Sequence, residues 1–487
     1  MKAIQFCLFV ALIVLGACSE ERQISGHLDG MPELFPDYAE VTIPYNIAPL
    51  NFAVRSDREP VLAQFSDGNL SFEIESQDGE IQIPAKKWNR LLSAAKGKSI
   101  EITIAQKQQG KWMAYAPFTI HVADQPVDPY IAYRLIEPGY ALWNQMGIYQ
   151  RNLQSFDETA VYENKITNYN CVNCHSFCMQ NPDRMLFHMR AKLDGTVLIN
   201  DDRAELLDTK TDQTISALVY PYWHPSGKYV AFSVNKTTQQ LHPTNRTEVY
   251  DTASDVVVYD IEKHTILSVP AILSKNSFET FPSFSPDGRT LFFCSAPACS
   301  MPDSINTLRY SLCSLSFNPE TGTFGEKVDT LYNARINPKS VSFPRVSPNG
   351  KFLLCTLSDY GTFPVWHKEA DLYLIDLQTK TGVYPEVANS DDTDSYHSWS
   401  SNSHWVVFSS RRLDGLYTRP FIAYVDKDGN IAKPFLLPQK DTGYYDLLMK
   451  SYNIPEFVTG KVRNHSVGIR KMVGQERIPV RFTWSNP

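Results

Sequence analysis

Short apolar segments, separated by polar turns, recur along most of the chain. Four clear copies of one segment occupy residues 220–233, 281–294, 343–355 and 396–409. Each copy begins with an aromatic residue and continues through a turn, such as the Ser-Pro-Asp-Gly turn at 285–288, into an apolar run. Proline fixes φ in such a turn and glycine accepts positive φ, so the chain reverses sharply. The pattern therefore predicts two neighbouring strands of a sheet in every copy.

The repeat has the length of a propeller blade. A second strand pair is predicted after the first in three copies, within residues 255–261, 371–377 and 421–426, and four strands make one blade. The residues that end the first strands recur about every 50–60 residues, and they are Trp223, Phe284, Val346 and Trp399. A fainter copy at Phe177 gives a fifth blade. A sixth blade, built from the tail after residue 440 with residues before Cys171, would close the ring.

The turn repeat resembles the TolB-type propeller repeats over residues 171–430. The resemblance implies six blades around a central channel. Period-two alternation at 27–125, with Asp-Gly hairpin turns, predicts a small β-sandwich that is similar to immunoglobulin-like modules in architecture. We therefore expect an all-β chain, with a β-sandwich at 27–125, a linker of uncertain structure at 126–170 and a TolB-type β-propeller at 171–487.

The first residues predict export and a lipid anchor. Lys2 precedes an apolar run at 4–15 that is too short to span a bilayer, and residues 15–18 (Leu-Gly-Ala-Cys) resemble a bacterial lipobox. The resemblance implies a signal peptide at 1–17, lipidation of Cys18 and a polar tether at 18–26. An ordinary signal with an incidental cysteine is the alternative. We expect a protein of the bacterial cell envelope, held at the outer membrane by lipid and facing either the periplasm or the surface.

Charge and motifs narrow the classes of function. The 487 residues carry 46 Lys and Arg against 53 Asp and Glu, a net charge of −7, without a run of five like charges. Nucleic-acid binders carry a basic patch or stripe, so we expect no nucleic-acid partner. The sequence has no GxSxG elbow, HExxH motif or Walker loop, which favours a protein that is not an enzyme.

The sharpest chemical signal is the run Cys-Val-Asn-Cys-His at 171–175. CxxCH is the attachment motif of c-type haem, in which two thiols bind one porphyrin edge and the adjacent histidine is the proximal iron ligand. We therefore expect covalent haem c at Cys171 and Cys174, with His175 on the iron. Three alternatives stay open: a zinc site that adds Cys178, a redox disulfide between Cys171 and Cys174, and a structural role.

This motif and its surroundings resemble a group of bacterial lipoproteins described as TolB-like or as related to cytochrome c biosynthesis. The matching stretches are residues 169–177, 185–188, 222–228, 409–415 and 433–439. They extend from the upstream linker nearly to the end of the chain. Because ordinary small cytochromes c are helical, a CxxCH motif at the start of a propeller blade departs from their pattern.

Alignment of the copies suggests a second iron ligand. The residues in register with His175 are Pro221, Pro282, Pro344 and His397. These positions lie where a blade meets the channel, so His397 is a candidate distal ligand, and neutral imidazole binds iron well. Rivals that lie close in sequence are Met179, Met185, His188 and Met189. An open sixth position is the remaining alternative.

Two classes of function follow from these patterns. The first is a lipid-anchored electron-transfer protein or haem-dependent sensor, with a redox partner in the envelope. The second is a propeller scaffold that binds a protein or glycan partner, with the CxxCH in a structural or metal-binding role. The first predicts a covalent haem signal, and the second predicts partner binding that survives the loss of Cys171.

Overall fold

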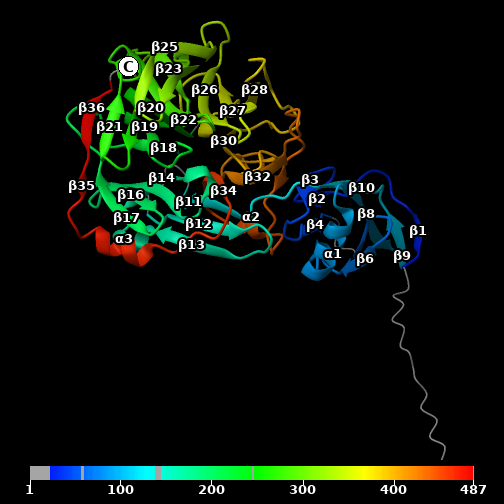
Figure 1. Ribbon diagram of the computed structural model, residues 1–487. Helices are drawn as coiled ribbons and strands as arrows, with labels where there is room; N and C mark the ends of the chain where they lie inside the picture. The colour runs from blue at the N-terminus through cyan, green and yellow to red at the C-terminus, as the bar shows by residue number, and fades with distance from the viewer. Residues whose placement is uncertain (1–21, 56–59, 138–143, 244–245, 486–487) are drawn as a thin grey trace, which may run out of the picture.

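The computed structural model describes residues 22–55, 60–137, 144–243 and 246–485, without the side chains of Cys174 and Arg246. The described residues form two parts, and strands are the main secondary structure in both. Figure 1 shows a smaller unit of residues 24–123, in blue, beside a larger body that the rest of the chain forms. Among these residues, no helix combines the length and the apolar character needed to cross a membrane.

The smaller unit contains two sheets and one helix. The seven strands of the larger sheet are β1 (Ile24–His27), β3 (Thr42–Pro44), β5 (Val61–Ser66), β6 (Ser71–Ser76), β8 (Lys98–Gln108), β9 (Lys111–Ala114) and β10 (Phe118–Ala123). The second sheet consists of β2 (Leu34–Phe35), β4 (Phe52–Val54) and β7 (Glu80–Ile81). Helix α1 (Ala85–Ala95) buries Trp88, Leu91 and Leu92, whose spacing makes one apolar helix face. The pairs β1–β9 and β3–β10 are parallel, so this unit is not a purely antiparallel sandwich.

The larger body contains six sheets, which we number 1 to 6. The first strand named for each sheet is the strand that contacts the first strands of the two neighbouring sheets. Sheet 1 consists of β14 (Cys171–Phe177), β15 (Arg184–Arg190), β16 (Gly195–Asn200), β17 (Arg203–Asp208) and β35 (Ile478–Pro479), and sheet 2 of β18 (Val219–Trp223), β19 (Tyr229–His242), β20 (Arg246–Asp260), β21 (Thr265–Ser268) and β36 (Arg481–Trp484). Sheet 3 consists of β22 (Ser277–Phe284), β23 (Thr290–Pro297), β24 (Ser311–Asn318) and β25 (Thr323–Tyr332), and sheet 4 of β26 (Ser340–Val346), β27 (Phe352–Ser358), β28 (Asp371–Asp376) and β29 (Gly382–Val383). Sheet 5 consists of β30 (Asp394–Trp399), β31 (Trp405–Ser410), β32 (Arg419–Tyr424) and β33 (Phe435–Leu436), and sheet 6 of β34 (Ser451–Val458), β11 (Tyr130–Ile136), β12 (Gly147–Asn152) and β13 (Glu158–Glu163). Short helices in the connections are η1 (Asn164–Thr167), η2 (Cys178–Gln180), η3 (Ile305–Thr307), η4 (Pro364–Trp366), α2 (Tyr444–Leu447) and α3 (Ser466–Met472).

Distant parts of the chain complete the arrangement of sheets. In sheet 6, β34 pairs with β11, so the stretch 126–170, expected as a linker of uncertain structure, supplies three strands. Strands β35 and β36 add in parallel to the outer edges of sheets 1 and 2, where they are red in Figure 1. The first strands contact one another in a closed circle, in the order β14, β18, β22, β26, β30, β34 and back to β14. The larger body is therefore propeller-like.

The predicted turns set the ends of the first strands. Strands β18, β22 and β26 end at Trp223, Phe284 and Val346, the positions that the repeat marks. Gly288 and Gly350 follow in the turns with φ of 71° and 74°, which glycine adopts without strain. The prediction that each copy joins two adjacent strands through a tight turn is confirmed in sheets 2 to 4.

The two parts of the molecule share one apolar cluster and several polar contacts. Residues of both parts, including Trp88 and Trp405, belong to the same buried cluster. Asn51 Nδ2 donates to the carbonyl oxygens of Gln439 and Lys440 at 3.3 and 3.0 Å, and its Oδ1 accepts from the backbone N–H of Ile83 at 2.9 Å. The smaller unit is thus packed onto sheet 5 and the segment that follows it.

Candidate functional site

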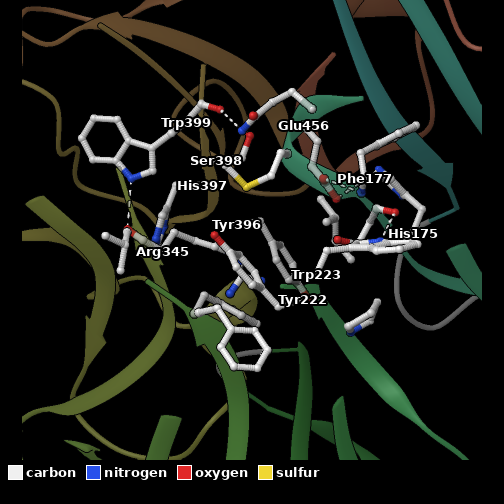
Figure 2. A pocket seen from close by; sticks show the side chains of 18 of the residues that line it. His175, Phe177, Tyr222, Trp223, Arg345, Tyr396, His397, Ser398, Trp399 and Glu456 are labelled. Atoms are coloured by element: carbon white, nitrogen blue, oxygen red, sulfur yellow. Dashed lines mark hydrogen bonds and ion pairs between the residues drawn. The ribbon is translucent and has the colours of Figure 1, made fainter. Parts of the chain in front are cut away.

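A pocket lies where the first strands of all six sheets meet. Its lining residues include Phe177, Trp223, Phe284, Arg345, His397 and Glu456, one from each sheet. Figure 2 shows His175, Phe177 and Glu456 on one side of this pocket, and Arg345, His397 and Trp399 on the other. We call it the central pocket.

A backbone bulge repeated in every sheet shapes the pocket wall. The pairing register shifts at the same place in all six first strands. Five of the residues at this place have positive φ, between 49° and 52°, namely Tyr220, Phe281, Phe343, Tyr396 and Ile454. Left-handed backbone is strained for such residues and persists only where the surroundings enforce it, and bulges re-aim side chains. Here the bulge exposes these five side chains to the central pocket. Cys174 occupies the same place in β14.

Aromatic rings from the bulges pack against one another within the pocket. The centroids of Phe281 and Phe343 are 4.2 Å apart, and those of Phe343 and Tyr396 are 4.6 Å apart. Tyr220 stands 4.8 Å from Phe281 in an edge-to-face arrangement. Phe363, from the segment between β27 and β28, contacts three of these rings. This aromatic cluster fills much of the space between the strands and leaves a pocket of about 90 Å³.

His175 faces the pocket with its imidazole ring. Its side chain is 0% exposed, and neither ring nitrogen makes a hydrogen bond of ordinary geometry with the described residues. Phe177 contacts the ring edge-on at a centroid distance of 6.0 Å. Burial, with the positive charge of Arg134, lowers the pKa of His175 to about 3, against the opposing effect of a hydrogen-bonding contact with the backbone of Ile454. The imidazole is therefore neutral near pH 7, with one N–H donor and one acceptor available.

Glu456 lies next to His175 on β34. Its Oε1 is 3.9 Å from His175 Nε2, and its Oε2 accepts a hydrogen bond from the backbone N–H of Phe177 at 3.1 Å. Burial raises the pKa of Glu456 to about 8, against the opposing effect of the Phe177 hydrogen bond and of Arg345. The carboxyl group is therefore mostly protonated near pH 7 and can donate a hydrogen bond into the pocket.

Arg345 supplies the positive charge of the pocket wall. Its Nη1 donates to the carbonyl oxygen of Pro344 at 2.9 Å, and its Cζ lies 4.9 Å from the ring centroid of Tyr222. No carboxylate of the described part of the chain lies within ion-pair distance of Arg345. Burial lowers its pKa, but a guanidinium keeps its charge in proteins. The pocket therefore contains a cation without a compensating anion.

His397 and Ser398 complete the polar side of the pocket. His397 Nε2 lies 2.8 Å from the carbonyl oxygen of Leu354 and donates to it, and Nδ1 makes no hydrogen bond of ordinary geometry although the ring also has a hydrogen-bonding contact with the backbone of Phe343. Burial lowers the pKa of His397 to about 3, so this ring is neutral as well. The Ser398 hydroxyl has no partner among the described residues. The indole N–H of Trp399 donates to the carbonyl of Arg345 at 3.0 Å and ties sheets 4 and 5 together.

The remaining candidate iron ligands lie in different places. His188, on β15, contacts Thr196 Oγ1 through Nδ1 at 3.2 Å and is absent from the described lining of the pocket. Met185 and Met189 pack in the apolar cluster between sheets 6 and 1. Only Met179 of the three methionines lines the pocket. The structure thus brings His175 and His397 to one space and leaves His188 outside it.

Of the cysteines next to His175 in the sequence, Cys171 and Cys178 are absent from the described lining of the central pocket. Cys171 packs against the apolar cluster that contains Met189, and it is not one of the described residues that line the central pocket. Cys178 belongs to a different cluster and lies 3.9 Å from the carbonyl oxygen of His224. The Cys174 side chain and all of Cys18 lie outside the described residues. No group of three or more His, Cys, Asp or Glu side chains in the described part has the arrangement of a metal site.

The residues around His175 do not fit a haem. The ring nitrogens suit an iron ligand, but the free volume of about 90 Å³ is below that of a cavity of 150 Å³ that binds benzene. A porphyrin is far larger than benzene. Cys171 and Cys174 are also three residues apart in a strand, where the rise places them about 10 Å apart along the chain. The thiol of Cys171 and the imidazole of His175 face different spaces.

The sequence analysis missed Arg345, Ser398 and Glu456. They occupy equivalent places in sheets 4, 5 and 6, two residues after the bulge residue. The alignment of the repeats could have pointed to Arg345 and Glu456. Both are charged, whereas the equivalent positions of the first three sheets hold the uncharged residues Ser176, Tyr222 and Ser283. Residues 454–457 (Ile-Pro-Glu-Phe) repeat the Phe-Pro-Ser-Phe at 281–284, although no Pro-Asp-Gly turn follows them.

Comparison with solved structures gives matches of low sequence identity, among them two peptidases and a DUF4784 family protein. No family model and no curated protein matches the chain. It is similar to a prolyl oligopeptidase B from Galerina marginata, with 10% identity and a TM-score of 0.37, over 63% of this chain and 44% of that one. It is also similar to a puromycin-hydrolysing peptidase from Mycobacterium tuberculosis, with 12% identity and a TM-score of 0.35, over 82% of this chain and 57% of that one. A DUF4784 family protein from Bacteroides caccae matches with 9% identity and a TM-score of 0.30, over 73% of this chain and 95% of that one. The chain spans about half the length of the two peptidases. With TM-scores below 0.5, these matches do not bear on the site.

Proposed function

We propose that this chain is a lipid-anchored binding protein of the bacterial cell envelope, whose six-bladed TolB-type propeller holds a protein partner at the central pocket. The observation that carries the proposal is the composition of the pocket. It collects Arg345, His175 and Ser398 from three sheets, all with unused hydrogen-bonding capacity or charge. Aromatic side chains surround them.

The propeller part of the proposal has two supports. The six first strands touch in a closed circle, and each carries the same bulge. The turn repeat at 171–430 resembles that of TolB-type propellers. Sheet 6 joins β11–β13 to β34, so that strands from both ends of the body would close the ring of blades.

A binding role explains the unsatisfied polar atoms. A buried donor or acceptor without a partner costs about 1–3 kcal/mol, and native structures contain few such atoms. Ser398 Oγ is in this state at the pocket, and both ring nitrogens of His175 and Nδ1 of His397 make no hydrogen bond of ordinary geometry there; other described residues away from the pocket also have such atoms. A ligand that supplies their partners removes this cost. Pockets of this kind, apolar with a few converging polar groups, are the usual form of binding sites.

Anchoring completes the proposal and rests on the sequence. The lipobox-like residues 15–18 imply that the mature chain begins at a lipidated Cys18. Residues 24–26 of the predicted tether belong to β1, the first strand of the smaller unit, so the predicted boundary between tether and sandwich at residue 27 is wrong. The partner would be a protein of the same envelope compartment.

Site-specific photo-crosslinking tests the proposal in cells. A photo-reactive residue at Pro286, on the pocket rim, is expected to form an adduct with the partner. A pocket-filling Ser398→Trp change in the same chain should abolish that adduct. The matched control is a photo-reactive residue at Val387, which is 62% exposed and remote from the described lining. No adduct at 286, or an adduct that Ser398→Trp leaves unchanged, would rule out partner binding at the pocket.

A further inference from the structure

The lone cation of the central pocket indicates the chemistry of its ligand. Arg345 is half-buried, its Cζ lies 4.9 Å from the Tyr222 ring, and its hydrogen bond at 2.9 Å goes to a neutral backbone carbonyl. An unpaired charge in such surroundings is costly unless an anion compensates it. The described residues provide no carboxylate at ion-pair distance. Glu456 is the nearest acidic group in the pocket, but its carboxyl is mostly protonated near pH 7, so an anionic ligand would supply the missing countercharge there.

The size of the pocket limits what the anionic group can be. Its free volume of about 90 Å³ is smaller than the cavity that accepts benzene, so only a small group enters. A phosphate dianion needs a second positive charge, and Arg345 is the only arginine or lysine among the lining residues that the structure describes. A carboxylate is small and planar, and it matches the fork of a single guanidinium.

The neighbouring groups can complete the coordination of a carboxylate. Ser398 is on the adjacent sheet at the same place in the repeat as Arg345, and its hydroxyl lacks a partner. His175 is 0% exposed and lines the pocket, and its ring lies close to the backbone of Ile454 and to Glu456 Oε1, but neither ring nitrogen makes a hydrogen bond of ordinary geometry. Its neutral ring can donate one hydrogen bond. These donors and Arg345 line the same pocket from sheets 1, 4 and 5, with His175 across the pocket from Arg345.

The rim of the pocket suits the remainder of a larger ligand. Pro225, Pro286 and Pro348, from the turns after β18, β22 and β26, line the pocket together with Trp223 and Phe284. This apolar rim favours a group that continues outward from the carboxylate. Both a polypeptide C-terminus and a small free carboxylic acid have the required anionic end.

We propose that the central pocket binds a ligand carboxylate through the guanidinium of Arg345, with Ser398 and His175 as hydrogen-bond donors. This inference rests on the proposed function and names the group that enters the pocket. The rest of the ligand lies against the apolar rim.

Calorimetric titration of the full chain tests the inference with defined probes. The probes are N-acetyl-trialanine with a free carboxylate, the same peptide with a C-terminal amide, and sodium acetate, with sodium chloride as the blank. We expect the free acid to bind at least tenfold more tightly than the amide. Peptide binding tenfold tighter than acetate identifies a chain end as the ligand, and equal binding identifies a small free carboxylate.

Variants connect the binding to Arg345. Arg345→Gln should weaken binding of the free acid at least tenfold, and Arg345→Lys, which keeps the charge without the fork, should weaken it less. Arg335→Gln, at an exposed arginine between β25 and β26, is the matched control, and unfolding midpoints verify that each variant folds. Equal binding of acid and amide, no carboxylate binding by the wild type, or unchanged binding in Arg345→Gln overturns the inference. If the crosslink at residue 286 persists in that case, the proposed function stands and only the carboxylate assignment is lost.

Discussion

His175 Nε2 lies 3.9 Å from Glu456 Oε1, and the two groups form a largely uncharged contact near pH 7. Burial is the main cause in both cases, because it lowers the pKa of the imidazole to about 3 and raises that of the carboxyl to about 8. Neither group neutralises the other. The contact therefore leaves Arg345 as the charge that dominates the central pocket.

Glu456 should make the protein less stable as pH rises. Its pKa is about 8 in the folded chain and near 4.5 when unfolded, so the folded state binds more protons between these values. Stability then falls as pH increases from about 4.5 to 8, by linkage. Glu456→Gln should reduce the fall in the thermal unfolding midpoint between pH 6.5 and 8, whereas the exposed Glu320→Gln should not. Parallel midpoint curves for wild type and Glu456→Gln would contradict the assignment.

The CxxCH motif and the central pocket lead to different expectations about haem attachment at β14. The motif predicts thioether bonds at Cys171 and Cys174, whereas His175 is covered in a pocket too small for a porphyrin. We expect protein from a host that matures c-type cytochromes to have the mass of the chain without haem. A mass higher by one haem, lost in a Cys171→Ala/Cys174→Ala variant, would show that β14 leaves the pocket wall during maturation.

The polar contacts of Asn51 should hold the two parts of the molecule together. Its side chain is 3% exposed and satisfies backbone groups of Ile83, Gln439 and Lys440. Asn51→Ala leaves these groups unpaired and should lower the free energy of unfolding by about 1–3 kcal/mol. The exposed Asn69→Ala serves as the control. Denaturant unfolding followed by tryptophan fluorescence checks the difference, and equal midpoints for the two variants would refute it.

The repeat could be predicted from the sequence because it is produced by turns, and each turn depends on a few neighbouring residues. Pro286 and Gly288 fix a tight turn, and the aromatic at 284 ends the strand before it, whatever the rest of the chain does. The sixth sheet was predicted only in outline, from the expectation that the tail after residue 440 and residues before Cys171 would close the ring. The structure builds sheet 6 from residues 130–163 and 451–458, which lie in these two segments. The bounds and pairing of its strands could not be predicted, because no turn connects β34 to β11 and pairing between segments so distant depends on closure of the circle of sheets.

The candidate site was predicted in part for the same reason. The alignment of the repeat copies predicted that His175 and His397 face the same space, and both line the central pocket. Register could not show that the thiol of Cys171 faces an apolar cluster between sheets, because side-chain direction in β14 changes at the bulge. Arg345 carried no motif, and its lack of a partner is visible only once the six sheets are assembled.

Cys18 should determine whether the protein stays on the membrane. The lipobox-like residues 15–18 predict acylation of this thiol, and a single acyl chain binds membranes only marginally, so we expect a diacyl anchor. Cys18→Ala should move the protein from the membrane pellet to the soluble fraction, whereas Cys7→Ala, within the signal peptide, should not. Membrane retention of Cys18→Ala at the wild-type level would exclude a lipid anchor at this residue.

Carboxylate binding should weaken in alkaline solution because of Glu456. The groups that face this carboxyl are His175 on β14, Tyr222 on β18 and Arg345 on β26. His175 is neutral above a pKa of about 3, and burial raises the pKa of Tyr222, so neither loses or gains charge between pH 6 and 9. Glu456 ionises near pH 8; its negative charge then repels the ligand and competes for Arg345. Affinity for N-acetyl-trialanine should be constant from pH 6 to 7 and at least tenfold lower at pH 9.5, and Glu456→Gln should remove this loss. A wild-type affinity that stays level to pH 9.5 would show that Glu456 does not act on the bound carboxylate.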